Sequence, residues 1–193
     1  GTLRRFFDAL FGRTRLPKPK TEGVFGLITA EVGIQAELGW TPAGRAALCL
    51  KPLGTRDFAL AGEELEELVR LVAGESGTQT ETKADELGYR WLIFTDPDFE
   101  DLVGVVHVAG NELQAKGYGG QLLAAVFPFA PGAGQGSCYL IYSYKRGAFY
   151  PFIPRPGNKR DTAAELSAAG ALERELPVEK DHSRWYPLWD LPV

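Results

Sequence analysis

The chain has 193 residues, of which 45% are hydrophobic, 24% charged and 11% aromatic; this composition is typical of one globular domain and excludes disorder over most of the chain. Two cysteines, Cys49 and Cys138, are too few for a disulfide framework or a four-cysteine zinc site. The net charge of −4 divides into +5 for residues 1–20 and −9 for the rest. Because nucleic-acid recognition needs a basic face, this acidic main body predicts no nucleic-acid partner.

The first 20 residues form a basic arm. Apolar side chains recur at helical spacing from Leu3 to Phe11, which predicts a short amphipathic helix, and Pro17 and Pro19 alternate with lysines in a linker that cannot be helical. We therefore expect an arm over residues 1–20 and an α+β domain over residues 21–193. The arm is a candidate for contact with an anionic membrane surface, and docking on its own acidic body or on a partner is the alternative. The residues assigned to the membrane contact are Arg4, Arg5, Phe6, Phe7 and Phe11.

Beyond the arm, the spacing of apolar residues predicts alternating helices and strands. In chain order we expect a helix over 24–38, a strand over 46–50, a helix over 63–73, strands over 78–83 and 89–94, a helix over 98–116, strands over 121–129, 137–144 and 148–153, and a helix over 161–175. Hairpins dominate this order, and no regular strand–helix–strand alternation is present. The predicted fold is therefore α+β, with a largely antiparallel sheet flanked by helices in a single domain.

The longest uncharged stretch, residues 117–144, is long enough to cross a bilayer. It contains Pro128, Pro131 and a glycine-rich loop, which would leave backbone groups unpaired in lipid, so it predicts two strands joined by a loop. The N-terminus has no apolar signal region and the chain has no glycosylation sequon. We expect a cytoplasmic protein, and contact of its arm with the inner face of the membrane is one of the alternatives left open for the arm.

Motifs that carry known chemistry are missing. The sequence has no H-E-x-x-H, no G-x-x-x-x-G-K-[ST] and no G-x-S-x-G. The run Gly132 to Gly136 precedes a predicted strand instead of a helix, so it is interpreted as a hairpin loop and not as a phosphate site. Neither the histidines nor the cysteines have the spacing of zinc ligands. We predict no cofactor, no metal and no catalytic residue.

Three further features have structural interpretations. His107 lies near the apolar stripe of its helix and is expected to be a core or boundary histidine. Both cysteines fall in apolar strands and are expected to be buried, unreactive thiols. The acidic residues of the cluster Asp96 to Asp101 stand where a helix begins, so they are expected to cap it.

Basic and aromatic side chains alternate in the segment Tyr139 to Arg155, which reads YLIYSYKRGAFYPFIPR. Arginine among aromatic rings can recognise an anion, a peptide or a partner surface, and an aromatic sheet with a basic turn is the alternative. The tail Arg184 to Trp189 either caps the core or presents anchors to a partner. The candidate partner- or ligand-binding residues are Lys145, Arg146, Tyr150, Arg155 and Trp185.

Several of these segments together resemble the PspA-associated protein PspAB family over nearly the whole chain. They are L-x-x-F-F-x-x-L-F-G-R (Leu3 to Arg13), the turn from Gly39 to Gly44, Y-K-R-G-A-F-Y-P-F (Tyr144 to Phe152), Arg160-Asp161, L-P-V-E (Leu176 to Glu179) and R-W-Y-P-L-W (Arg184 to Trp189). The resemblance implies a role beside PspA, the membrane-remodelling coiled-coil protein of the phage-shock response. Members are also associated with membrane zinc proteases of the HtpX type, but this chain lacks the protease motif.

We therefore expect a non-enzymatic accessory or adaptor protein of the PspA-type envelope-stress response. Its expected partners are a PspA-like coiled-coil protein and, secondarily, a membrane protease or an anionic membrane surface. Two alternatives stay open. In the first, the chain is a small-ligand or anion-binding protein, or an enzyme, whose pocket is lined by the segment Tyr144 to Arg155. In the second, it is a binding module similar in element order to type III secretion chaperones, which is an analogy of fold alone.

Overall fold

A computed structural model of the chain describes residues 20–51, 58–131 and 136–193. The predicted helix Leu3–Phe11, the linker after it, the five arm residues assigned to a membrane contact and residues 132–135 of the glycine-rich loop lie outside these ranges. At Lys20 the backbone N–H donates to the carbonyl of Tyr144 over 2.9 Å. The described fold thus begins at the last residue assigned to the arm.

The described residues form one large antiparallel sheet of seven strands in the order β3-β4-β2-β5-β6-β7, with β1 pairing with β5. Its strands are β1 (Thr41–Pro42), β2 (Arg45–Leu50), β3 (Gln79–Ala84), β4 (Arg90–Thr95), β5 (Leu122–Ala130), β6 (Cys138–Ser143) and β7 (Ala148–Phe152). A separate hairpin joins β8 (Pro154–Arg155) to β9 (Lys159–Arg160). This is the expected α+β, single-domain architecture.

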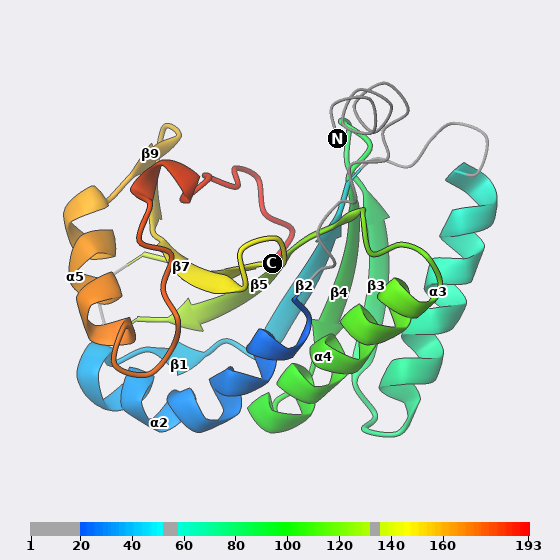
Figure 1. Cartoon of the computed structure of the whole chain (residues 1–193), viewed down its shortest axis with the longest axis horizontal. Helices are drawn as coiled ribbons and strands as arrows, with labels where there is room; N and C mark the ends of the chain where they lie inside the picture. Colours follow the sequence, from blue (N-terminus) through cyan, green and yellow to red (C-terminus); the bar gives the residue numbers. More distant parts are fainter. Residues whose placement is uncertain (1–19, 52–57, 132–135) are drawn as a thin grey trace, which may run out of the picture.

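Helices gather on one face of the sheet (Figure 1). They are the 3-10 turn η1 (Glu22–Gly26) and the helices α2 (Leu27–Leu38), α3 (Phe58–Gly74) and α4 (Phe99–Ala115), while α5 (Thr162–Leu172) packs against β7 and α2. The apolar side of α4 lies against β2, β4 and β5, and Leu102, Val106 and Ala109 are fully buried there. Among the described residues, no helix combines the length and apolarity needed to cross a membrane.

The opposite face of the sheet is also apolar but has a different cover. Its side chains form a second buried cluster that includes Ala47, Ile93 and Val126. The C-terminal segment, which we define as residues 185–193 and which follows the short turn η2 (His182–Arg184), packs on this cluster in place of a helix. Three side chains of the sheet hold its backbone: Tyr150 donates to Tyr186, Tyr139 to Val193, and Arg45 to Pro192.

The expected order of helices and strands is confirmed, and the differences lie at the ends of elements. The helix expected over 24–38 is a 3-10 turn followed by α2, which ends at Gly39 in the left-handed conformation. The third helix starts at Phe58, five residues before the expected Glu63, and α5 ends at Leu172 instead of 175. The sequence did not indicate β1, β8, β9 or η2, all of which are two or three residues long. The uncharged stretch forms β5 and β6, as expected.

The three structural interpretations also agree with the structure. At the start of α4 the carboxylate of Asp98 accepts from the backbone N–H of Asp101, and Asp96 accepts from that of Asp98. His107 is a boundary residue whose ring nitrogens lie 3.3 Å from the carbonyl oxygen of Thr21 and 3.2 Å from the amide nitrogen of Asn111. Both cysteines are buried and free.

Candidate functional site

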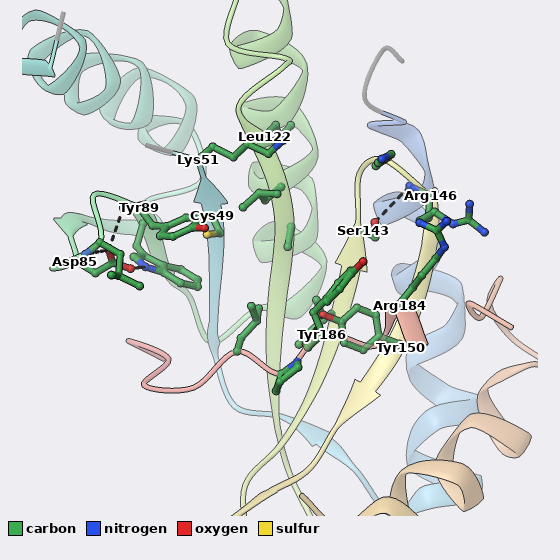
Figure 2. A pocket seen from close by; sticks show the side chains of 18 of the residues that line it. Cys49, Lys51, Asp85, Tyr89, Leu122, Ser143, Arg146, Tyr150, Arg184 and Tyr186 are labelled. Carbon is green, nitrogen blue, oxygen red and sulfur yellow. Dashed lines mark hydrogen bonds between the residues drawn. The ribbon is translucent and has the colours of Figure 1, made fainter. Parts of the chain in front are cut away.

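A groove of about 620 Å³ opens on the face of the sheet that carries the C-terminal segment (Figure 2). Its floor is built from side chains of β2, β4, β5, β6 and β7, and the C-terminal segment forms one wall. The apolar lining includes Trp91, Ala124, Ile141, Tyr150, Leu188 and Trp189. A groove arises here because this face is apolar like its opposite, whereas the nine-residue segment covers only part of it.

One end of the groove, which we call the basic mouth, carries Lys51 and Lys145. Lys51 follows β2 and donates its backbone N–H to Gln121, while Tyr144, at the end of β6, donates to Leu123. Both lysines thus flank the start of β5, on either side of it. Since neighbouring strands lie about 4.8 Å apart, the two backbones are separated by roughly 10 Å. Within the described parts of the chain, neither lysine forms an ion pair.

Arg146 also lines the groove and is fixed by a two-pronged ion pair with Glu179. Its Nε lies 2.9 Å from Oε2 and its Nη2 lies 3.1 Å from Oε1. The hydrogen bond from Arg146 lowers the pKa of Glu179, and the same bond raises the pKa of Arg146. Glu179 is 5% exposed, so its charge depends on Arg146 for neutralisation.

The groove lining contains two carboxylates, those of Asp85 and Asp190. It contains four cationic side chains: Lys51, Lys145, Arg146 and Arg184. Asp85 is already occupied, because Oδ1 accepts from the backbone N–H groups of Leu87 and Tyr89 and Oδ2 accepts from the indole of Trp91. It therefore organises the turn between β3 and β4. The groove is basic although the chain from residue 21 onward carries a net charge of −9.

The structure brings together three of the five residues predicted to bind a partner or ligand. Lys145, Arg146 and Tyr150 line the groove. Arg155 lies beyond the other end of β7, whose five residues span roughly 16 Å, and pairs with Asp161 at 2.9 Å. Trp185 is 5% exposed and stacks on Tyr150 with ring centroids 6.4 Å apart, so it caps the core. The binding role assigned to these residues stays a prediction.

Sequence reasoning missed several lining residues, among them Lys51, Trp91, Leu188 and Trp189. The tail was recognised as aromatic, yet its position against β2, β6 and β7 depends on contacts between distant parts of the chain. Lys51 carried one available signal, since in the sequence it stands between the apolar run of a predicted buried strand, residues 46–50, and Pro52.

The ionisable groups of the groove floor are held in their neutral forms. Burial raises the pKa of the Cys49 thiol to about 12 and also raises the pKa of the Tyr150 hydroxyl. A thiol with such a pKa is protonated at neutral pH and is a poor nucleophile or metal ligand. Among the described residues, no three His, Cys, Asp or Glu side chains are grouped to hold a metal ion. The groove is thus arranged to bind through apolar contacts and positive charge.

Comparisons with known proteins place the chain in a family. No curated protein matches it, and no solved structure matches it. A family model, PspAB or PspA associated protein B, matches residues 4–193. That match includes the basic mouth, the segment Tyr144 to Phe152 and the C-terminal wall of the groove. The chain therefore belongs to the PspA-associated protein B family.

Proposed function

We propose that this protein is a non-catalytic adaptor that binds a PspA-type coiled-coil protein through acidic side chains of that partner. The observation that carries the proposal is the basic mouth on an otherwise acidic domain. Complementary charge steers partners together and fixes their orientation, so an isolated basic site on an acidic surface selects an acidic segment. The family description supports PspA as the protein that carries that segment.

The exposed side chains around the mouth suit a protein contact. Lys145 and Arg146 are exposed, and Tyr186 on the adjoining wall is 59% exposed. Tyrosine and arginine are enriched among residues that dominate binding energy in protein interfaces. Arg146 is held in place by Glu179, so it loses little side-chain freedom when a partner binds.

The test is a titration of the full chain against a purified PspA-type protein by calorimetry. The double variant Lys51→Glu/Lys145→Glu reverses the charge of the mouth and should weaken binding at least tenfold, or about 1.4 kcal/mol. Lys159→Glu reverses one charge at an exposed position of β9, outside the groove lining, and should bind like the wild type. Raising the salt concentration should lower the partner affinity of the wild type more than that of the double variant. Absence of wild-type binding, or equal binding by all three proteins, would contradict the adaptor proposal.

Contact of the arm with the membrane is a separate part of the proposal. Its support is sequence-based: three phenylalanines on the predicted stripe and six basic residues before Thr21. At low salt the full chain should sediment with anionic liposomes, whereas a chain starting at Thr21 should stay in the supernatant. Equal behaviour of the two proteins would remove the membrane contact.

A second candidate function is the binding of a small ligand inside the groove. The observation in its favour is the volume of the groove, about 620 Å³, which falls within the range of small-molecule sites. The lining is largely apolar with a few charged groups, as such sites commonly are.

A further inference from the structure

The groove joins an end that carries two lysines to an apolar floor, and its rim also carries Arg184, Asp85 and Asp190. The polar end holds Lys51 and Lys145, on either side of the start of β5, and the chain at Gly119 and Gly120 lies between them. Away from this end, the floor presents Ala124 and Ile141. A ligand that satisfies both regions needs a compact anionic group joined to an apolar body.

The apolar part is bounded on two sides. The sheet provides the floor, and Leu188 and Trp189 of the C-terminal segment provide a wall. That segment crosses the sheet below Lys51 in Figure 2. An apolar chain placed there would bury its surface against side chains from both, which is the source of hydrophobic binding energy. The lysine side chains are long enough to keep their charges at the water interface while their stems contact apolar surface.

The volume of the groove, about 620 Å³, lies within the range of small-molecule sites. A single acyl chain is narrow and apolar, so it can lie along the apolar floor while its head group lies at the lysines. The chemistry of the lining, an apolar floor with two lysines at one end, is what favours this class of ligand.

We infer that the groove binds a single-chain amphiphile with a carboxylate head group, of the fatty-acid class. The chain lies on the floor formed by Ala124 and Ile141, and the carboxylate lies between Lys51 and Lys145. This inference rests on the ligand-binding candidate above and is independent of the adaptor proposal, because it concerns the protein without a partner.

The test uses three twelve-carbon amphiphiles that differ only in head group: dodecanoate, dodecanol and dodecyltrimethylammonium, each below its critical micelle concentration. Calorimetry gives the affinity, and tryptophan fluorescence reports occupancy because Trp91 and Trp189 line the groove. Dodecanoate should bind at least tenfold more tightly than the other two. In Lys51→Gln/Lys145→Gln, dodecanoate should lose that preference and bind like dodecanol, whereas the control Lys159→Gln should keep it.

A second variant tests the floor. Ala124→Phe places a large side chain in the groove and should weaken dodecanoate and dodecanol alike by at least tenfold. Its fold is checked by circular dichroism, and the exposed lysine variants keep the inference testable if Ala124→Phe is unfolded.

Each contrary result overturns a different statement. Equal affinity for the three amphiphiles would overturn the carboxylate assignment and leave an apolar ligand site. Absence of dodecanoate binding, or binding unchanged in both groove variants, would overturn the inference itself. If the partner titration still depended on Lys51 and Lys145 in that case, the adaptor proposal would stand and the mouth would serve a protein contact alone.

Discussion

Replacing Trp185 by alanine should destabilise the protein strongly and thereby distinguish a core residue from a partner anchor. The indole ring is 5% exposed and stacks on Tyr150 at an interplanar angle of 12°. The indole N–H donates to the carbonyl of Glu179 over 2.8 Å. The ring also contacts the ring of His182, with 4.5 Å between the two centroids. The next residue, Tyr186, is 59% exposed and provides the comparison.

The expected magnitudes follow from these contacts. Truncating a buried tryptophan to alanine costs about 3–5 kcal/mol, which is a large part of the roughly 5–15 kcal/mol that stabilises a typical domain. For a chain of this size that loss lowers Tm by about 6–20 °C. Trp185→Phe keeps a ring against Tyr150 but leaves the Glu179 carbonyl without its donor, so we expect a loss of about 1–3 kcal/mol. Tyr186→Ala should change the stability by less than about 0.5 kcal/mol.

Urea denaturation followed by circular dichroism measures all three variants against the wild type. The free energy of unfolding should decrease in the order wild type and Tyr186→Ala, then Trp185→Phe, then Trp185→Ala, with little change in the m-value. If Trp185→Ala and Tyr186→Ala were equally stable, the tail would not be part of the core. A loss of partner affinity in Trp185→Ala is informative only after correction for this loss of stability.

Three other predictions concern single groups. Glu179 has a lowered pKa in the folded protein, so its stabilising effect is complete above the unfolded pKa of about 4.3 and is lost as pH falls through the folded value. The stability difference between wild type and Glu179→Gln, measured in urea, should therefore shrink from pH 7 to pH 3, and a constant difference would refute the assignment. Gly23→Ala should cost about 1–3 kcal/mol, because its Cβ would overlap the hydroxyl of the buried Tyr142; Gly170→Ala in α5, where the space is open, should be neutral or stabilising in the same urea assay. Burial raises the pKa values of Cys49 and Cys138 to about 12, so neither thiol should react with Ellman's reagent at pH 8 until the protein is unfolded. Rapid reaction of either thiol in the folded protein would contradict this burial.

Elements with strong signals at both ends were predicted closely. The fourth helix was expected over 98–116 and occupies Phe99–Ala115, because Asp98 caps its start and Gly117, with φ of 94°, follows its end. The start of α3 was missed because the regular apolar spacing is recognisable only from Glu63. The two-residue strands β8 and β9 are too short for any periodicity, and the residues between them, Pro156, Gly157 and Asn158, favour a turn.

The site was predicted in part because strand order cannot be derived from local patterns. Period-two alternation explains why Tyr150 faces the groove while Phe149 faces the helices. The nearness of Lys51 to Lys145 depends on β5 lying between β2 and β6, although more than 70 residues separate β2 from β5 in the chain. Such pairing is set by the whole fold and is not encoded near either lysine.

The two faces of the sheet show why the groove is located where it is. Every residue of β2 from Ala46 to Leu50 is buried, so both faces require cover, yet helices α2, α3 and α4 all lie on one of them. The other face depends on the C-terminal segment, which has no helix and whose backbone accepts hydrogen bonds from the side chains of Arg45, Tyr139, Tyr150 and Arg160. A helix there would have filled the space above Ala124 and Ile141; the thinner segment leaves it open. Because an incompletely covered apolar surface favours binding, the position of this segment supports the groove as the binding site that we propose.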